Sequence, residues 1–399
     1  MLTVKLKKER NKSVLRKHPW IFSGAILSSD DVTVNGQTVK VISFDGKFLG
    51  YGAYSLQSQI AIRLYSFDKN ELINKDFFIK KISDAISARN NIIDLENTNT
   101  YRLINSESDY LPGLIVDKYN NTLVCQFLSA GAEFWKKDIV EILINLIKPK
   151  TIFERSDSEV RLKEGLQPST GLLWGKEPDD LIEIIENGKK FFVDIRKGHK
   201  TGFYIDQRDN REILSEYCMR KNVLNCFSYS GGFSVYAIKS GAVKVTNIDS
   251  SKEALDLAEK NFSLNKIDNN CYENINDDVF KALRTFRDSR KEFDLIILDP
   301  PKFAESLSQV EKASRGYKDI NLLAIKLLKK DGLLFTFSCS GHISFELFTK
   351  IISDAALDSG KTLQIIRYLN QAKDHPIITS FPESLYLKGV ICRVISNQI

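Results

Sequence analysis

The sequence lacks any run of eighteen consecutive apolar residues, and its basic N-terminal stretch is not followed by the apolar segment typical of a signal peptide. These absences argue against a membrane-spanning helix and against secretion, so we expect a cytoplasmic protein with no membrane partner. Cysteine is scarce, and no two cysteines have the C-x-x-C spacing of a zinc site or a redox motif. The six are Cys125, Cys218, Cys226, Cys271, Cys339 and Cys392. We therefore expect reduced thiols and no metal.

The length and charge of the chain bear on the number of domains and on the kind of partner. A chain of 399 residues is long for one domain, so two or three domains are expected. The net charge of +6 and the isoelectric point near 8.7 are mildly basic. This charge suits a polyanionic partner such as a nucleic acid but does not establish one.

Residues 1–70 have the pattern of a small β domain. The first twenty residues carry seven lysines or arginines, Lys5 and Lys7 among them, against the single acid Glu9. Three strands separated by turn residues are expected over 38–44, 48–54 and 60–67. A basic edge beside aromatic side chains can grip phosphates and stack bases. Solvated surface charge and ordinary core aromatics are the alternative interpretation.

Residues 71–186 read as a central α+β domain. Helices are expected over 71–90 and 133–146, and strands over 113–116, 122–127 and 151–154. A polar loop follows, beginning at Arg155, whose cations could reach a nucleic acid. The alternative is that most of its charges are solvated.

Residues 187–399 change to strict alternation of strand and helix. Strands are expected over 222–227, 243–248, 271–275, 293–299 and 333–338, helices over 232–239, 251–265, 278–286, 309–329 and 344–357, and two final strands over 363–368 and 386–394. Five such βα units predict a doubly wound parallel sheet. Ligands bind such sheets at the carboxyl ends of the strands.

Three successive strand ends have ligand-binding character. The first leads into Phe227–Gly232, where glycines permit close approach of a ligand and the next helix presents its amino end. The second ends at Asp249, which can accept hydrogen bonds from both hydroxyls of a ribose. The third ends at Asn276-Asp277-Asp278, placed to bind an adenine edge. Together they predict a pocket for S-adenosylmethionine (SAM), although each alone could be a turn or a helix cap.

The fourth and fifth strand ends carry candidate catalytic groups. Asp299-Pro300-Pro301 ends a buried strand with a rigid turn and resembles the motif with which class I SAM methyltransferases hold an acceptor base or amine. A cap that merely stops the strand is the alternative. Cys339 ends the next strand at the same edge of the sheet, where Ser340, Gly341 and the following helix should expose and acidify the thiol.

A thiolate beside a methyl-donor pocket suits methylation of carbon 5 of a pyrimidine. That carbon becomes nucleophilic only after a thiolate adds to carbon 6, and a base must then remove the C5 proton. Asp299 would hold the N3 and N4 edge of the ring. His375 and Asp374 are candidates for the base, and a structural role for them is equally open.

The sequence resembles the RlmI family of bacterial 23S rRNA cytosine-C5 methyltransferases. Besides the segments named above, the resemblance rests on motifs along nearly the whole chain, namely His18–Gly24, Glu154–Asp157, Arg315–Asn321, Phe337–Ser340, Asp374–Pro376 and Tyr386–Gly389. It implies an N-terminal PUA domain over 1–70, a central α+β domain over 71–186 and a Rossmann-like SAM methyltransferase domain over 187–399. It also implies SAM as donor, S-adenosylhomocysteine as product and 23S rRNA as partner. A homodimer is left open.

The expected site residues follow from these arguments and from the resemblance. We expect Cys339 and Asp299 to be catalytic, Cys339 as the nucleophile. The cofactor-binding set is Phe227, Ser228, Ser230, Gly231, Gly232, Asp249, Asp277, Asp278, Asp299 and Pro300, and the substrate-binding set is Lys302, Phe303, Lys5, Lys7, Arg155 and Lys200. Two alternatives are a SAM-dependent N-methyltransferase acting on an RNA base without a covalent intermediate and a non-catalytic RNA-binding factor.

Overall fold

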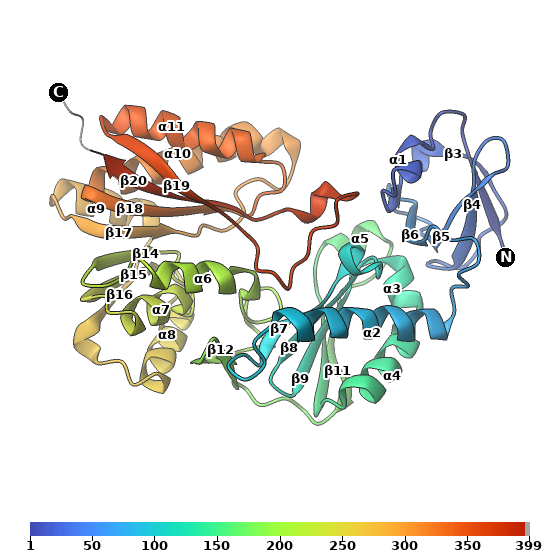
Figure 1. The fold of residues 1–399 in the computed structure, drawn as a ribbon, viewed down its shortest axis with the longest axis horizontal. Helices are drawn as coiled ribbons and strands as arrows, with labels where there is room; N and C mark the ends of the chain where they lie inside the picture. Colours follow the sequence, from blue (N-terminus) through green and yellow to red (C-terminus); the bar gives the residue numbers. More distant parts are fainter. Residues whose placement is uncertain (396–399) are drawn as a thin grey trace. The chain divides into compact units, whose positions relative to one another are not determined.

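The computed structural model describes residues 1–395 of the chain and divides into two compact units. The N-terminal unit comprises residues 1–186, 193–206 and 373–384. The C-terminal unit comprises residues 187–192 and 207–372 and continues from residue 385. Figure 1 shows both units and labels many of their elements.

The N-terminal unit begins with a six-stranded sheet in the order β2-β6-β5-β4-β1-β3. Its elements are β1 (Thr3–Leu6), α1 (Lys12–Leu15), β2 (Trp20–Ile21), β3 (Ile26–Ser29), β4 (Thr38–Ile42), β5 (Phe48–Tyr54) and β6 (Ile62–Ser66). Apolar side chains that alternate along β1 and β4, such as Val4 and Val41, are fully buried in one core. The small β domain predicted from the sequence is therefore present, with its strands close to the expected ranges.

A second sheet of this unit has five strands in the order β11-β10-β9-β8-β7. Its strands and the helices around them are α2 (Lys75–Ile92), β7 (Thr100–Asn105), β8 (Leu114–Tyr119), β9 (Thr122–Phe127), α3 (Ala130–Phe134), α4 (Lys136–Ile147), β10 (Thr151–Ser156), α5 (Val160–Lys163) and β11 (Ser169–Gly175). A further strand, β12 (Ile182–Glu186), lies outside this sheet. The side chain of Asn74 caps α2 by accepting a hydrogen bond from the amide of Phe77. Phe78 and Ile82 on α2 share a core with the sheet.

Two features of this second sheet differ from the sequence prediction. The single helix expected over 133–146 is interrupted at Trp135, where the backbone leaves the helical region between α3 and α4. Strands β7 and β11 were not predicted. Five of the six residues of β7 are buried, and they include polar as well as apolar side chains. The strand therefore lacks the regular alternation of polar and apolar residues by which a strand is predicted.

Buried ion pairs join the two sheets of the N-terminal unit. Arg63 on β6 donates hydrogen bonds to Glu107 at 3.0 Å and to Glu164 at 2.9 Å. The indole Nε1 of Trp20 donates to the same Glu107 carboxylate at 2.7 Å. One arginine therefore ties the small β domain to two segments of the central domain.

The C-terminal unit contains a seven-stranded sheet in the order β16-β15-β14-β17-β18-β20-β19. The strands of this sheet and the helices around them are α6 (Arg208–Ser215), β14 (Asn222–Cys226), α7 (Gly232–Lys239), β15 (Lys244–Asp249), α8 (Lys252–Leu264), β16 (Tyr272–Asn276), α9 (Val279–Asp288), β17 (Phe293–Leu298), α10 (Val310–Leu327), β18 (Leu328–Ser338), α11 (Phe345–Ser359), β19 (Thr362–Asn370) and β20 (Lys388–Ile395). Strand β13 (Lys189–Val193) lies outside this sheet. The first five strands are parallel, and β20 runs antiparallel to both of its neighbours.

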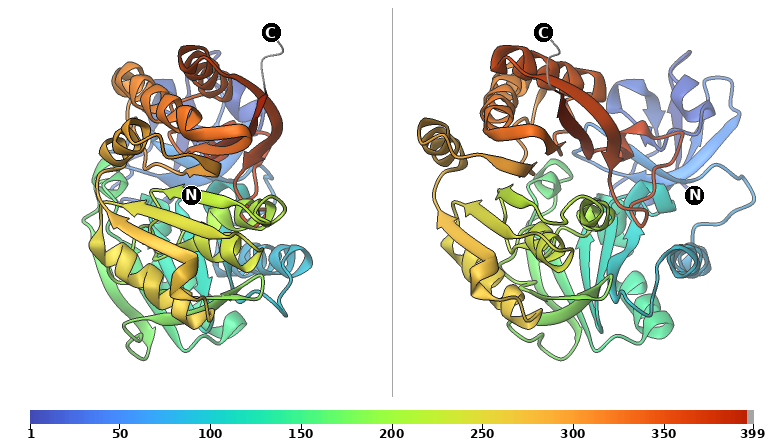
Figure 2. Two further views of the ribbon diagram at one scale, coloured as in Figure 1. Left: turned by 90° about the vertical axis from the view of Figure 1, so that its left-hand side faces the viewer. Right: turned by 60° about the vertical axis from the view of Figure 1, so that its left-hand side comes forward.

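Helices cover both faces of this sheet (Figure 1). Alternate residues of β14 enter different cores, because Leu224 packs with α9, α10 and α11 while Val223 packs with α6 and α7. Figure 2 shows α10 and α11 side by side. The doubly wound parallel sheet predicted from the alternation of strands and helices is confirmed. It brings the carboxyl ends of β14 to β18 to one edge.

Candidate methyltransferase site

The loop after β14 has the backbone of a ligand-binding turn. Phe227, Tyr229 and Gly231 all have positive φ angles, of 59°, 47° and 76°. The hydroxyls of Ser228 and Ser230 are buried and have no hydrogen-bond partner within residues 1–395. Buried hydroxyls normally find partners, so this loop offers polar atoms whose hydrogen bonds a polar ligand can complete. The loop therefore fits a small polar cofactor such as SAM.

Gly231 has structural reasons to be glycine that Gly232 lacks. A Cβ atom at Gly231 would lie 2.9 Å from the ring of Phe262, and its φ of 76° disfavours any other residue. A Cβ atom at Gly232 would meet only the flexible side chain of Arg211, at 3.3 Å. Gly231 is thus required by the packing of the loop against α8, whereas Gly232 begins α7.

Asp249 is held in a fixed orientation at the end of β15. Its Oδ2 accepts a hydrogen bond from the amide of Tyr229 at 2.8 Å, and its Oδ1 accepts one from the amide of Ser251 at 2.9 Å. Each carboxylate oxygen has a second lone pair. The carboxylate therefore links the β14 loop to the β15 end and can still accept hydrogen bonds from ligand hydroxyls.

The two acids after β16 are not equivalent. Asp278 caps α9, because its side chain accepts a hydrogen bond from the amide of Lys281 at 3.0 Å. Asp277 is half-buried, and its Oδ1 lies 2.9 Å from the amide of Asp278 and 3.2 Å from Lys281 Nζ. Asn276, at the same strand end, donates from Nδ2 to the carbonyls of Asp249 and Ser250. Of the two acids, Asp277 is better placed for a ligand.

Asp299 at the end of β17 is oriented by a buried amide chain. Gln207 Nε2 donates to Asp299 Oδ1 at 2.9 Å, and Asn210 Nδ2 donates to Gln207 Oε1 at 2.6 Å. Asn210 is anchored in turn to the carbonyl of Asn370 at 2.9 Å. Sequence reasoning missed Gln207 and Asn210. Their only signal was a pair of amide side chains three residues apart at the start of α6, which places them on one helix face.

The residues after Asp299 differ in exposure. Pro300 is buried, whereas Pro301 and Lys302 are exposed. The centres of the Phe303 and Tyr317 rings lie 4.6 Å apart, and Phe303 packs against the core to which α10 contributes. Lys302 is thus available to a substrate, while Phe303 is largely committed to packing.

Cys339 follows β18 directly, beside the β17 end that carries Asp299. In the parallel pair, Leu298 is the register partner of Thr336, so Asp299 and Cys339 lie one and three residues past that pair. Cys339 is half-buried, as is Cys271, whereas the other four cysteines are buried. Burial raises the pKa of Cys218 and Cys392 to about 12 and raises that of Cys125 and Cys226 even more. Cys339 is thus the half-exposed thiol at the carboxyl edge of the sheet.

Serine hydroxyls around Cys339 fix its backbone. The hydroxyl of Tyr317 lies 3.0 Å from Ser338 Oγ and 3.1 Å from Ser340 Oγ. Ser340 Oγ also accepts a hydrogen bond from the amide of Ala304 at 3.3 Å. These bonds join the Cys339 segment to α10 and to the segment that follows the two prolines.

His375 and Asp374, the candidates for the C5 base, belong to the N-terminal unit and are buried there. Asp374 Oδ2 accepts a hydrogen bond from the amide of Arg102 at 2.8 Å, and Asp374 Oδ1 lies 3.1 Å from His375 Nδ1. The carbonyl of Asp374 accepts a hydrogen bond from Arg89. This network favours a structural role for both residues.

The four substrate-binding candidates of the N-terminal unit have different surroundings. Lys5 Nζ lies 5.2 Å from the centre of the Phe44 ring, and Lys7 Nζ donates to the carbonyl of Gly24 at 3.0 Å. Arg155 is buried, and its guanidinium holds the carbonyls of Ile195 and Gly198. A fourth candidate, Lys200, forms an ion pair with Asp206 at 2.5 Å. Arg155 is thus engaged in the structure, whereas Lys5 and Lys7 carry charge on the surface.

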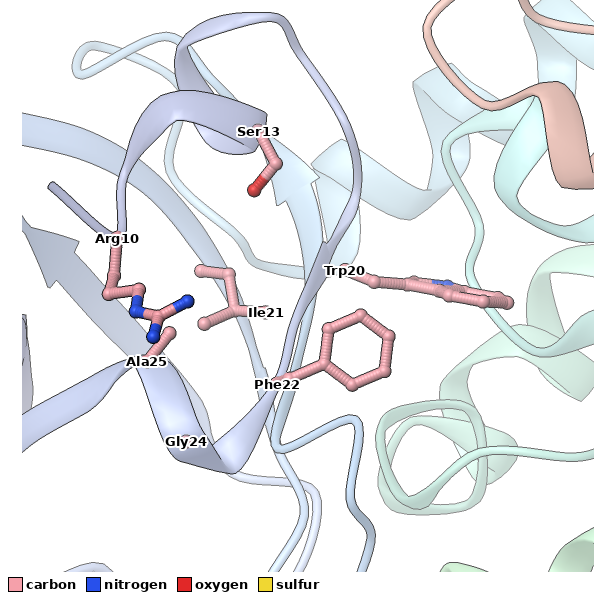
Figure 3. A pocket seen from close by; sticks show the side chains of 7 residues that line it. All are labelled: Arg10, Ser13, Trp20, Ile21, Phe22, Gly24 and Ala25. Carbon is pink, nitrogen blue, oxygen red and sulfur yellow. The ribbon is translucent and has the colours of Figure 1, made fainter.

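A pocket of about 280 Å³ lies beside α1 in the small β domain. It is lined by Arg10, Ser13, Trp20, Ile21, Phe22, Gly24 and Ala25. Figure 3 shows Trp20 and Phe22 on one side of the strand and the guanidinium of Arg10 on the other. Phe22 as a whole residue is 52% exposed. Sequence reasoning gave aromatics beside a basic edge, but not this pocket.

Residues 1–395 contain neither a membrane-spanning helix nor a cluster of metal ligands. None of the helices in this range is both long and apolar enough to cross a membrane. No group of three or more His, Cys, Asp or Glu side chains among these residues could hold a metal ion.

Comparison with protein families gives two matches. A model of the S-adenosylmethionine-dependent methyltransferase family matches residues 155–359, about half of the chain. A PUA-like domain model matches residues 4–67.

Curated relatives extend the similarity to nearly the whole chain. A ribosomal RNA large subunit methyltransferase I from Aeromonas salmonicida is 51% identical over 388 residues, which are 97% of this chain and 98% of the relative. The protein of the same name from Aliivibrio fischeri is 50% identical over 394 residues, 99% of this chain and 100% of the relative.

Solved structures share the fold. A SAM-dependent methyltransferase structure from Streptococcus mutans superposes with a TM-score of 0.85 at 24% identity, over 99% of this chain and 100% of that chain. A second methyltransferase structure, crystallised with S-adenosylhomocysteine, gives 0.86 with the same identity and coverage.

Proposed function

This chain belongs to the family of the ribosomal RNA large subunit methyltransferases I, which are SAM-dependent, and we propose on that premise that it methylates C5 of a cytosine in 23S rRNA. The proposal comes from one feature above all. A half-buried cysteine, Cys339, directly follows β18, and Asp299 directly follows the neighbouring strand β17. A SAM methyltransferase acting on a nitrogen needs no such thiol.

SAM is the methyl donor of this family. When bound, it supplies the electrophilic methyl group. The residues that would hold it are Phe227, Ser228, Ser230, Gly231, Gly232, Asp249, Asp277, Asp278, Asp299 and Pro300. The unpartnered hydroxyls of Ser228 and Ser230 support this assignment, as does the orientation of Asp249 by two amides.

Cys339 would act as the nucleophile. Its thiolate adds to C6 of the cytosine, and the resulting electron density at C5 makes that carbon able to accept a methyl group. A base then takes the C5 proton, and the bond between sulfur and C6 breaks to release 5-methylcytosine and the thiolate. Asp299, held by Gln207, would bind the N3 and N4 edge of the ring, which supports protonation of the ring during the addition.

The rest of the chain would hold the RNA. We assign residues 1–70 to a PUA-like RNA-binding domain, 71–186 to a central α+β domain and 187–399 to the methyltransferase domain. Lys5 and Lys7 provide surface charge that phosphates can approach, and the exposed Phe22 ring can stack on a base. Lys302, exposed beside Asp299, would contact the RNA next to the target base. The target must leave its stack so that C6 can meet the sulfur atom.

A methyl-transfer assay with analysis of the product nucleosides tests the proposal. Unmodified 23S rRNA is incubated with the protein and with SAM carrying a labelled methyl group, and the digested nucleosides are identified by mass spectrometry. We expect labelled 5-methylcytidine from the unmodified protein and a loss on the order of a thousandfold or more in Cys339→Ala. Cys271→Ala, which removes a thiol of similar exposure, is the matched control and should retain activity. A labelled N-methylated nucleoside that Cys339→Ala still produces would instead support N-methylation.

A further inference from the structure

Lys388 is a buried lysine next to Cys339. It begins β20, and its register partner on the antiparallel strand β18 is Ser338, the residue before Cys339. Its Nζ donates a hydrogen bond to the carbonyl of Ser340, the residue after Cys339, at 3.0 Å. The lysine side chain therefore runs along the segment that carries the thiol. Only 4% of the residue is exposed to solvent.

No carboxylate within residues 1–395 forms an ion pair with this ammonium group. A protonated lysine has three N–H donors, and the Ser340 carbonyl accepts from one of them. A buried ammonium without an anionic partner is costly. Burial accordingly lowers the pKa of Lys388, and the negative charge of the Cys339 thiolate acts in the opposite direction.

Lys361, in the same unit, is a lysine with a structural role and allows a comparison of hydrogen-bond acceptors. It is also partly buried, and burial lowers its pKa as well. Its Nζ, however, donates to three carbonyls, those of Ile325, Lys326 and Leu328, at the end of α10. All three of its N–H groups thus have backbone acceptors, whereas Lys388 has one such acceptor and a thiol beside it.

We propose that Lys388 is a positioning residue that forms an ammonium–thiolate pair with Cys339 and keeps the sulfur ready to attack. The proton of the Cys339 S–H group moves to the neutral amine of Lys388, which gives a thiolate and an ammonium with no change in net charge. This pair is formed before any substrate arrives. For its role in the reaction, the proposal rests on the nucleophilic function proposed for Cys339.

Two other titratable groups lie near the Cys339 thiol. Tyr317 on α10 interacts with the charge of Cys339, although burial is the main reason for the raised pKa of this tyrosine. Asp299 ends the neighbouring strand. Of these groups only Lys388 can carry a positive charge, so it is the one that favours a thiolate.

The pH dependence of thiol alkylation tests the pair without RNA or SAM. The full-length protein is treated briefly with iodoacetamide between pH 5 and pH 10, and the modification of the Cys339 and Cys271 peptides is measured by mass spectrometry. We expect Cys339 to react at lower pH than Cys271. In Lys388→Met the profile of Cys339 should move upward by at least one pH unit, a tenfold loss of rate near neutral pH. Lys388→Arg, which keeps the positive charge, should retain most of the early reactivity, and Lys361→Met should leave the profile unchanged.

Two results would overturn the pair. One is a Lys388→Met profile that coincides with that of the unmodified protein. The other is a Lys388→Arg profile that moves upward as far as that of Lys388→Met while circular dichroism shows both variants folded. If Lys388→Met does not fold, Lys388→Arg alone decides, because loss of its early reactivity in a folded protein rejects the pair. An upward shift in Lys388→Met without any 5-methylcytidine from the unmodified protein would support the pair and reject the proposed function.

Discussion

Gln207 Nε2 lies 2.9 Å from Oδ1 of Asp299 and fixes the carboxylate that ends β17. Gln207 is itself buried and held by Asn210. A hydrogen bond to a charged group contributes about 1.5–3 kcal/mol. An interaction of this kind is most useful where the orientation of the carboxylate matters for the reaction.

Replacing Gln207 should therefore slow methyl transfer more than it weakens SAM binding. We expect Gln207→Leu to lower kcat about tenfold or more, because Asp299 loses a donor that orients it toward the target ring. The Kd for SAM should stay within about threefold, because the other residues assigned to SAM keep their positions. Steady-state kinetics and calorimetry measure the two quantities. Gln364→Leu, which removes an exposed amide bonded to Arg393, is the control and should change neither. Equal losses in kcat and in SAM affinity after Gln207→Leu would contradict this role.

Asp249→Ala should act on SAM binding. The substitution removes the carboxylate that accepts hydrogen bonds from the amides of Tyr229 and Ser251. We expect the Kd for SAM to rise about 10- to 100-fold by calorimetry, with RNA affinity unchanged, because a charge-assisted hydrogen bond of about 1.5–3 kcal/mol is lost. Asp268→Ala removes a turn cap remote from the proposed pocket and serves as control. An unaltered Kd for SAM in Asp249→Ala would remove Asp249 from the binding set.

Neutralising the basic start of the chain should weaken RNA binding in a salt-dependent way. We expect the triple variant Lys5→Gln, Lys7→Gln and Lys8→Gln to bind 23S rRNA fragments less tightly and to reduce the slope of log K against log salt by about two, since each phosphate contact contributes roughly 0.7–0.9. Filter binding at several salt concentrations measures this slope. The triple variant of the exposed lysines Lys244, Lys252 and Lys350 has the same change in charge and is the control. Equal slopes for the Lys5 triple variant and the unmodified protein would reject RNA contact by this segment.

The Glu107 carboxylate should make the stability of the N-terminal unit depend on pH. Burial raises its pKa, but attraction to Arg63 and hydrogen bonds from Ser106 and Trp20 lower it more, and the result lies below the ordinary 4.5. A lowered pKa in the folded state means that this contribution to stability is complete above pH 4.5. It is lost as the pH falls through the folded-state pKa.

Unfolding by urea measures this dependence through the fluorescence of the three tryptophans, all of which lie in the N-terminal unit. We expect Glu107→Gln to be about 3 kcal/mol less stable at pH 7, because it leaves Arg63 without one buried partner. The difference should shrink below pH 4.5. The exposed substitution Glu96→Gln should have little effect at either pH. A penalty that stays constant down to pH 3 would contradict the assigned pKa shift.

Local pattern was enough to predict the elements whose residues repeat with a clear period. The βα units of the C-terminal unit were predicted because apolar strands alternate with amphipathic helices, one of which, α8, is capped by the side chain of Ser251. The edge at which Asp249, Asp299 and Cys339 lie follows from that topology alone. Strand β7 was missed because buried polar residues such as Arg102 break its apolar pattern.

Contacts between distant segments could not be predicted from the same pattern. Gln207 meets Asp299 across 92 positions of sequence, and Lys388 meets Ser340 across 48. A glutamine at the start of a helix and a lysine at the start of a strand look like surface residues until the sheet order is known. Likewise, the contact between the rings of Phe303 and Tyr317 on α10 becomes visible only once the chain is folded.

Trapping on a modified RNA tests most directly the claim that Cys339 forms a bond to C6 of the target cytosine. RNA containing 5-fluorocytidine gives no C5 proton to remove, so an adduct formed after methyl transfer should persist. We expect the protein with SAM to form a denaturation-stable RNA adduct whose digested peptide contains Cys339, and we expect Cys339→Ala to form none. Methylation without any adduct, or an adduct on another cysteine, would contradict the covalent mechanism.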